Sequence, residues 1–106
     1  MKRGEVWWIN FDPAIGGEIR KKRPAVIVSN NAANQYLNRV QVIPLTSSID
    51  KLYPSESCVT IQGKKAKAMA DQITSVSKKR LINQAGTVSR SDLEGIARAI
   101  SIQLDL

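Results

Sequence analysis

The stretch RPAVIVS, residues 23–29, decides how this chain folds. Ala25 to Ser29 is an almost uninterrupted apolar, β-branched run, which predicts a fully buried central strand. Pro24 fits the first position of such a strand, where a missing N–H breaks no ladder hydrogen bond. Four consecutive cations, residues 20–23, lead into it. Because like charges repel one another, this run is either a solvated loop or a site for an anion.

The same reasoning, extended along the chain, predicts a mainly β protein. Strands are expected at residues 6–11, 25–29, 40–46, 57–62, 66–76 and 81–88. Pro44 falls inside the third of these and should lie at a sheet edge or a bulge. Residues 31–38 are too few and too polar for more than one or two helical turns.

The C-terminal residues change from a period of two to the period of a helix. Ser91 to Glu94 matches a capping box, in which the two side chains satisfy free amides at a helix start. One apolar stripe follows at helical spacing: Leu93, Ile96, Ala97, Ile100 and Leu104. We therefore expect residues 1–106 to form a single domain, a small barrel of five or six bent antiparallel strands with a C-terminal amphipathic helix.

The charge of the chain indicates a polyanionic partner. Sixteen Lys and Arg oppose nine Asp and Glu, so the net charge is +7. Such a surplus on a small domain is typical of nucleic-acid binding, although it also keeps a protein soluble. Cys58 is the single cysteine, so no internal disulfide is expected. Without an evident signal peptide or a run of about 18 apolar residues, we expect a cytoplasmic protein with no membrane contact.

Several kinds of catalytic chemistry are excluded by composition. The chain has no histidine, which removes histidine-based acid–base catalysis and histidine metal ligands. It has no glycine-rich nucleotide-binding motif and no carboxylate cluster suited to magnesium. We therefore expect no metal and no cofactor, and any catalysis must depend on Arg, Lys, hydroxyl groups and isolated acids.

Arg23 and Thr46 are the main candidates for a phosphate site. Arg23 is held in an extended conformation by the following Pro24 and offers a planar fork to two phosphate oxygens. Alternatively, Arg23 forms only a surface ion pair with Asp12 or Glu18. If the second and third strands are antiparallel neighbours, Thr46 lies close to Arg23 and adds a hydroxyl, unless it serves only in a turn.

Trp8 and a basic turn are further candidates for RNA contact. Trp8 lies on the strand face opposite Trp7, where it would stack on a base, form a subunit contact or belong to the core. Lys64, Lys65 and Lys67 would either extend a nucleic-acid surface or be solvated.

Seven stretches, in order along nearly the whole chain, resemble the MazF/PemK toxins, bacterial ribonucleases of type II toxin–antitoxin modules. They are Gly4–Trp8, Phe11–Pro13, Gly16–Glu18, Arg23–Ser29, Pro44–Ser47, Ala70–Ile73 and Gly86–Val88. The resemblance implies an SH3-like, CcdB/PemK-type barrel and a homodimer. It also implies sequence-specific cleavage of single-stranded RNA, including mRNA, without metal, leaving a 2′,3′-cyclic phosphate and a 5′-hydroxyl. A cognate antitoxin tail would occupy the RNA groove.

The resemblance also assigns roles to individual residues. The family's catalytic arginine and threonine correspond to Arg23 and Thr46, and its loop glutamate to Glu18, our candidate for the general base. The expected RNA-binding residues are Arg20, Lys21, Lys22, Ser47, Lys64, Lys65, Asp71 and Gln72. Two features depart from the family pattern: the first loop lacks a histidine, and Thr74 stands where many members have arginine. Two other functions compatible with these observations are a CcdB-like DNA gyrase poison and a non-cleaving single-stranded RNA-binding module.

Overall fold

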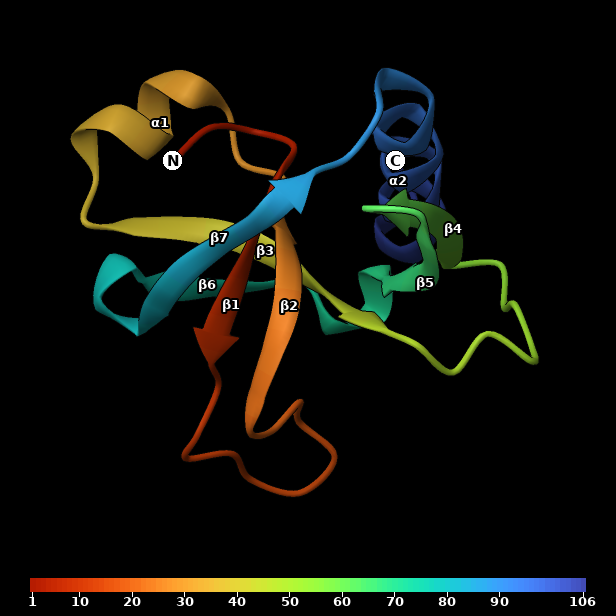
Figure 1. Ribbon diagram of the computed structural model, residues 1–106, viewed down its shortest axis with the longest axis horizontal. Helices are drawn as coiled ribbons and strands as arrows, with labels where there is room; N and C mark the ends of the chain where they lie inside the picture. The colour runs from red at the N-terminus through yellow and green to blue at the C-terminus, as the bar shows by residue number, and fades with distance from the viewer.

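The computed structural model describes all residues 1–106 and consists of one curled antiparallel sheet with two α-helices (Figure 1). The elements are β1 Glu5–Asn10, β2 Lys22–Ile27, α1 Asn31–Tyr36, β3 Arg39–Thr46, β4 Glu56–Ile61, β5 Lys64–Met69, a 3₁₀ turn at Ala70–Gln72, β6 Thr74–Ser77, a 3₁₀ turn at Lys78–Arg80, β7 Leu81–Thr87 and α2 Arg90–Leu104. The strand order is β4-β5-β3-β2-β1-β7, and β6 also pairs with β3. The predicted mainly β barrel with a short inserted helix and a C-terminal helix is confirmed as a half-barrel.

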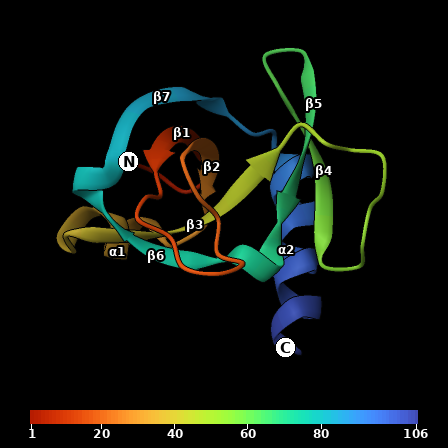
Figure 2. The same cartoon turned by 90° about the horizontal axis from the view of Figure 1, so that it is seen from below.

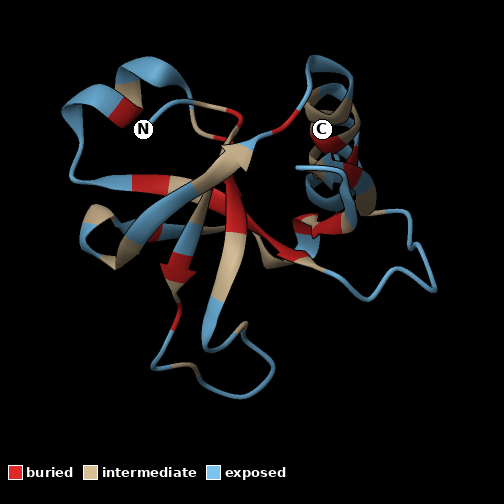
Figure 3. Ribbon diagram, viewed as in Figure 1, coloured by how far each residue is buried: buried red, intermediate tan, exposed pale blue.

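β2 lies in the middle of this sheet, between β1 and β3. Side chains alternate between the two faces of a strand, and both faces of β2 are covered. Val26 packs in one core with Ile43 and Ile96, under α2. Ile27 packs in a second core, which includes Ile9 of β1. This double burial accounts for the uninterrupted apolar run and is visible as the red centre of the sheet in Figure 3.

The strand expected over residues 66–76 is broken in two, and the sheet therefore has seven strands rather than five or six. The 3₁₀ turn over Ala70–Gln72 separates β5 from β6. Its first residue is buried, and the Ala70 amide donates to the Ser55 carbonyl oxygen at 3.0 Å. The chain turns here because β5 pairs with the end of β3, whereas β6 pairs with its beginning.

Pro44 lies at the point where β3 exchanges one partner for the other. Residues 39–42 pair with β6 and residues 45–46 pair with β5, which leaves Pro44 without a partner on this side. The residue is fully buried and faces Ala25 of β2. Of the two predicted positions, a sheet edge or a bulge, the edge is wrong: the proline occupies an interruption of the pairing within a central strand.

Both outer strands of the sheet are protected by side chains from other elements. The free side of β4 is covered by α2, and Asp92 accepts a hydrogen bond from the Thr60 amide at 2.9 Å. The tip of the β4–β5 hairpin reaches the opposite edge, where the Gln62 side-chain amide donates to the Ala85 carbonyl oxygen at 2.8 Å. Figure 2 shows the β4–β5 hairpin beside α2. The curl of the sheet is thus closed by side chains.

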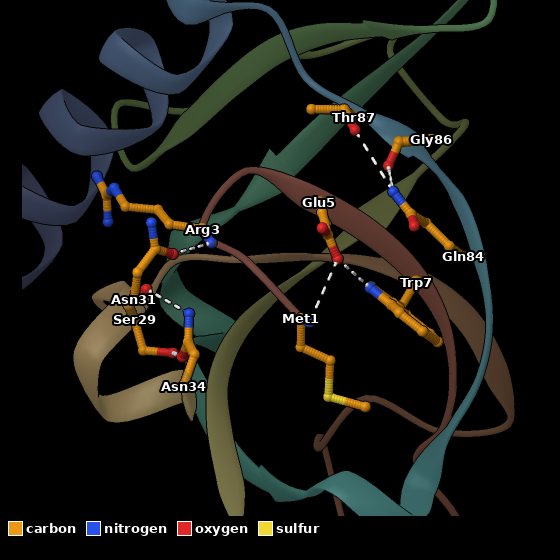
Figure 4. Close-up of polar contacts among 10 residues, drawn as sticks. All are labelled: Met1, Arg3, Glu5, Trp7, Ser29, Asn31, Asn34, Gln84, Gly86 and Thr87. Atoms are coloured by element: carbon orange, nitrogen blue, oxygen red, sulfur yellow. Dashed lines mark hydrogen bonds and ion pairs between the residues drawn. The ribbon is translucent and has the colours of Figure 1, made fainter. Parts of the chain in front are cut away.

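Polar contacts attach the N-terminal segment to α1 (Figure 4). The Arg3 amide donates to Asn31 Oδ1 at 2.8 Å, and the Arg3 guanidinium donates to the Val28 carbonyl oxygen. The buried Asn34 side chain donates to the Ser29 carbonyl oxygen at 2.9 Å. These contacts attach the segment before β1 to the residues that follow β2, at the end of β2 opposite Arg23.

The C-terminal helix begins earlier than the sequence pattern indicates. Ser89, rather than Ser91, is its N-cap, and the Ser89 hydroxyl accepts from the Asp92 amide at 3.0 Å. Glu94 is therefore not the third residue of the helix, where a capping box would need it, and its carboxylate lies 4.0 Å from Arg90 Nε. The expected apolar stripe is confirmed in part: Leu93, Ile96 and Ile100 pack in the core, whereas Leu104 is 49% exposed and Ala99, outside the predicted stripe, is buried. No helix of the structure has the length and apolar character needed to cross a membrane.

The two serines at the start of α2 provide a matched test of this cap. Ser89→Ala removes a side-chain acceptor from a free helix amide, so we expect the free energy of unfolding to fall by about 1 kcal/mol. Ser91→Ala lies inside the helix, where alanine is favourable, and should not lower it. Urea denaturation of both variants measures the difference, and equal losses would contradict the assignment of Ser89.

Candidate active site

A groove of about 550 Å³ opens where the C-terminal end of β3 meets the start of β2. It brings together most of the residues selected from the sequence. Its lining includes Trp8, Lys21, Lys22, Arg23, Thr46, Ser47, Lys64 and Lys65. The apolar part of its lining includes Val6 of β1 and Leu45 of β3, the two strands that flank β2. The site is thus a concave, cation-rimmed surface with an aromatic side chain in it.

The pairing of β2 with β3 brings Arg23 and Thr46 to the same end of the two strands. The two strands are antiparallel, and their ladder pairs Ala25 with Pro44. The ladder ends at this pair, and Arg23 and Thr46 each lie two residues beyond it. Both residues line the same groove. The expectation that the start of one strand adjoins the end of the other is therefore met.

Most of the hydrogen-bonding capacity of Arg23 is free. Its Nε donates to the Arg20 carbonyl oxygen at 3.2 Å, and its two terminal nitrogens have no protein partner. The alternative ion pairs with Asp12 and Glu18 are absent, because Asp12 accepts from the Lys21 amide and Glu18 from the Ile15 amide. A guanidinium oriented by its Nε and free at its terminal nitrogens can bind two oxygens of one phosphate.

Thr46 combines a turn contact with a free proton. Thr46 Oγ1 accepts from the Ser48 amide at 3.2 Å, so turn chemistry is part of its role. A hydroxyl that accepts one hydrogen bond still has its own hydrogen to donate. The contact with Ser48 orients the oxygen, and the O–H remains available to a ligand in the groove.

Trp8 is 41% exposed, and its indole N–H has no partner, whereas Trp7 is partly buried and donates to Glu5 at 2.9 Å. Trp8 is therefore not an ordinary core residue. Lys21 has a left-handed backbone (φ 68°), and its amide and carbonyl groups bond to Asp12 and Phe11. The cationic run is thus a structured entrance to β2.

Lys67 does not belong to the exposed basic turn that includes Lys64 and Lys65. Its side chain is buried, and its Nζ forms an ion pair with Glu56 at 2.9 Å. Lys65 and Lys67 lie on the same face of β5, and the difference arises along the strand: its first two residues are exposed, whereas Lys67 donates to the Lys51 carbonyl oxygen of the β3–β4 loop.

A second, smaller hollow of about 290 Å³ holds the acidic and amide candidates. Glu18, Asp71, Gln72 and Thr74 line it, and Arg23 and Thr46 do not. The loop over residues 12–21 separates the two depressions: Glu18 lines one of them, and Lys21 lines the other. Gln72 Nε2 donates to the Gly17 carbonyl oxygen at 3.3 Å. Arg20 lines neither depression, and its guanidinium donates to the Gly16 carbonyl oxygen.

Two residues that shape these depressions escape sequence reasoning. Arg80 donates to the carbonyl oxygens of Asn10 and Asp12 at 3.0 and 2.6 Å and so fixes the start of the 12–21 loop. Gln62 lines the groove and closes the half-barrel. The run Lys78–Arg80 was a visible signal for the first, but nothing in the sequence pattern distinguishes Gln62. No three His, Cys, Asp or Glu side chains lie together in a way that suits a metal ion.

Comparison with known proteins identifies the family. The model of the PemK-like, MazF-like toxins of type II toxin–antitoxin systems matches residues 2–104. The chain belongs to this family. The Mycobacterium tuberculosis endoribonuclease MazF9 is 40% identical over 115 aligned positions, which cover 100% of this chain and 98% of that protein. The predicted toxin family and endoribonuclease activity are thereby confirmed.

Solved structures of MazF proteins share the fold. MazF from Deinococcus radiodurans has a TM-score of 0.89 and 26% identity, and the match covers 100% of this chain and 97% of that one. A mycobacterial endoribonuclease, solved in complex with its cognate antitoxin, has a TM-score of 0.85 and 24% identity, with 100% and 96% covered. The half-barrel with its C-terminal helix is therefore a MazF fold.

The position of Glu18 generates a test of its role as general base. Glu18→Gln keeps an oxygen that accepts from the Ile15 amide but cannot take up a proton. Because this side chain lies outside the groove of Arg23, we expect the variant to cleave RNA within about threefold of the wild-type rate. A loss in kcat of about a hundredfold, the scale of general-base catalysis, would instead support proton abstraction by Glu18. Single-turnover cleavage of labelled RNA measures the difference.

Proposed function

We propose that this MazF-family toxin cuts single-stranded RNA, including mRNA, without a metal ion, by attack of a ribose 2′-hydroxyl on the adjacent phosphate. The observation that carries the proposal is the presence of Arg23 and Thr46 in the lining of one cation-rimmed groove. The guanidinium and the hydroxyl both have unused donors there. Together they supply the hydrogen bonds that a phosphodiester needs.

The reaction is an in-line displacement at phosphorus. A bond forms between the 2′-oxygen and phosphorus while the bond from phosphorus to the 5′-oxygen breaks. The 2′-hydroxyl loses its proton, and the leaving 5′-oxygen gains one. The products are a 2′,3′-cyclic phosphate and a 5′-hydroxyl, so neither a water molecule nor an oxidant is consumed.

Arg23 and Thr46 act on the charge that grows on the non-bridging phosphate oxygens. Hydrogen bonds to charged groups are worth roughly 1.5–3 kcal/mol each, and a preorganised donor aimed at developing charge contributes about 10²–10³ in rate. A guanidinium stays protonated at physiological pH, so Arg23 stabilises charge and can give a proton to the leaving oxygen, but it does not act as the base. Glu18, the candidate base from the sequence, lines the neighbouring hollow and not this groove, so we do not assign it the role of base.

The remaining predicted residues bind the RNA on either side of the reacting phosphate. Arg20, Lys21, Lys22, Lys64 and Lys65 attract the backbone, and Ser47 adds a hydroxyl beside Thr46. Trp8 offers an exposed ring for base stacking, which is worth about 1–3 kcal/mol per base. Asp71 and Gln72 lie in the neighbouring hollow, where carboxylate and amide groups would hydrogen-bond to base edges. The absence of a loop histidine and the presence of Thr74 make this hollow less basic than in many relatives.

The partners follow from the same surface. A mycobacterial relative of this fold has been solved with its cognate antitoxin. For this chain, with its net charge of +7, we propose an antitoxin with an acidic tail that lies in the groove and excludes RNA. We further propose a cytoplasmic homodimer, for which the exposed Trp8 is a contact candidate. The gyrase-poison and non-cleaving alternatives are superseded by membership of an endoribonuclease family.

Arg23→Ala should reduce cleavage by at least a hundredfold and leave the thermal midpoint nearly unchanged, because its guanidinium makes only one protein hydrogen bond. Cleavage of end-labelled RNA in the presence of EDTA measures the first effect and shows that no metal is needed. Discrete fragments that end in a cyclic phosphate are expected from the wild type. An Arg23→Ala protein that cuts at the wild-type rate would overturn the site assignment.

Lys22→Ala should mainly reduce the salt dependence of RNA binding. Each cation that neutralises a phosphate of single-stranded nucleic acid contributes about −0.7 to the slope of log K against log salt concentration. This residue is preferable to Lys21, whose left-handed backbone adds a conformational effect. Binding titrations of cleavage-deficient Arg23→Ala protein, with and without Lys22→Ala, compare the slopes. An unchanged slope would show that Lys22 makes no phosphate contact.

A further inference from the structure

Lys67 and Glu56 form a buried ion pair that the proposed chemistry does not use. Lys67 Nζ lies 2.9 Å from Glu56 Oε1, and both side chains are about nine-tenths buried (10% and 9% exposed). The pair is the only one in the chain between two buried side chains, because the other two ion pairs involve the N-terminus and an exposed arginine. Because removing two charges from water costs free energy, a buried ion pair contributes little net stability by itself. Its role here is therefore the segment that it holds in place.

The segment that it holds is the β3–β4 loop, residues 47–55. Lys67 Nζ donates to the Lys51 carbonyl oxygen at 2.7 Å, near the middle of this loop. Glu56 Oε1 also accepts from the Tyr53 amide at 2.9 Å, and the Tyr53 ring lies 5.5 Å from Lys67 Nζ, within the range of a cation–π contact. One buried ammonium and one carboxylate oxygen therefore bind the loop at two backbone points and one ring.

The same lysine is the direct neighbour of Thr46 in the sheet. The ladder between β3 and β5 pairs Thr46 with Lys67. Directly opposite residues of an antiparallel pair point to the same face, with Cβ atoms about 5 Å apart. Thr46 is also the last residue of β3, and its Oγ1 is oriented by Ser48, which belongs to the loop that Lys67 holds. Thr46 thus has Lys67 as its neighbour across the ladder, and its hydroxyl is oriented by the loop that Lys67 holds.

We infer that Lys67, with Glu56, is a positioning residue for RNA cleavage, which fixes the Thr46–Ser48 turn so that the Thr46 hydroxyl donates to the reacting phosphate. This inference rests on the proposed function of Thr46. The ammonium of Lys67 is used by Glu56 and the Lys51 carbonyl oxygen and does not itself bind RNA. Loss of the pair therefore affects the chemical step and leaves RNA binding intact.

The experiment measures kcat and KM for a fluorogenic single-stranded RNA that carries a cut site mapped from the 5′ ends the wild-type protein generates. Lys67→Met should lower kcat at least tenfold and change KM less than twofold. Because breaking one side of a buried pair can prevent folding, Lys67→Met/Glu56→Leu provides a second variant that removes both charges together with the loop anchors. It should show the same loss in kcat with a retained thermal midpoint. Lys79→Met, which removes an exposed lysine outside both depressions, is the matched control and should behave as the wild type.

A double-mutant cycle with Thr46→Ala separates positioning from general damage. If Lys67 acts through the Thr46 hydroxyl, Lys67→Met should have no further effect on kcat in the Thr46→Ala protein. If the losses in kcat caused by Lys67→Met and Thr46→Ala multiply in the double variant, or if Lys67→Met changes only KM, the inference is overturned. The proposed role of Thr46 would then still stand. A wild-type kcat in both Lys67 variants, together with a reduced kcat in Thr46→Ala, would also overturn the inference. Wild-type cleavage by Thr46→Ala would overturn the proposed role of Thr46 and the inference together.

Discussion

The burial of β2 on both faces is the constraint on which the rest of the structure depends. A strand with cores on either side cannot shift its register without exposing apolar side chains, so the residues at its ends have fixed positions. Arg23 is one of these residues: it pairs with Ile9 of β1 and lies two residues before Ala25, which pairs with Pro44 of β3. The groove around Arg23 and Thr46 therefore derives its geometry mainly from the hydrophobic effect, and polar contacts complete it.

The distribution of acidic groups explains why so many cations remain free. Four of the nine carboxylates accept hydrogen bonds from backbone amides: Asp12, Glu18, Glu56 and Asp92. Each of them stabilises a loop or covers a strand edge at a point where the main chain lacks a partner. Lysines and arginines near the groove then have no carboxylate to neutralise them, and the surface retains a positive potential suited to a nucleic acid. The carboxylates thus stabilise the backbone, and the lysines and arginines near the groove remain unpaired.

Sequence reasoning succeeded where one local rule dominated and failed where a distant contact decided. The buried run at Ala25–Val28 and the apolar stripe around Ile96 could be recognised from periodicity alone. The helix start could not, because Ser89 and Ser91 both suit a cap and Asp92 is also engaged by Thr60 of β4. The break at Ala70 and the burial of Lys67 depend on loop 47–55, whose path no local pattern specifies. In the same way, the spacing of Glu18 and Arg23 gave no sign that they lie in different depressions.

The closure of the half-barrel by Gln62 has a consequence for the shape of the groove. One wall of the groove is the tip of the β4–β5 hairpin, and it meets β7 through a single side-chain amide and the contact of Ile61 with Gly86. A Cβ at residue 86 would lie 3.1 Å from the nearest atom of Ile61, so glycine permits this close approach. The width of the groove is therefore set in part where the hairpin tip meets β7. A side chain larger than glycine at position 86 would push the hairpin away from β7 and change the width of the groove.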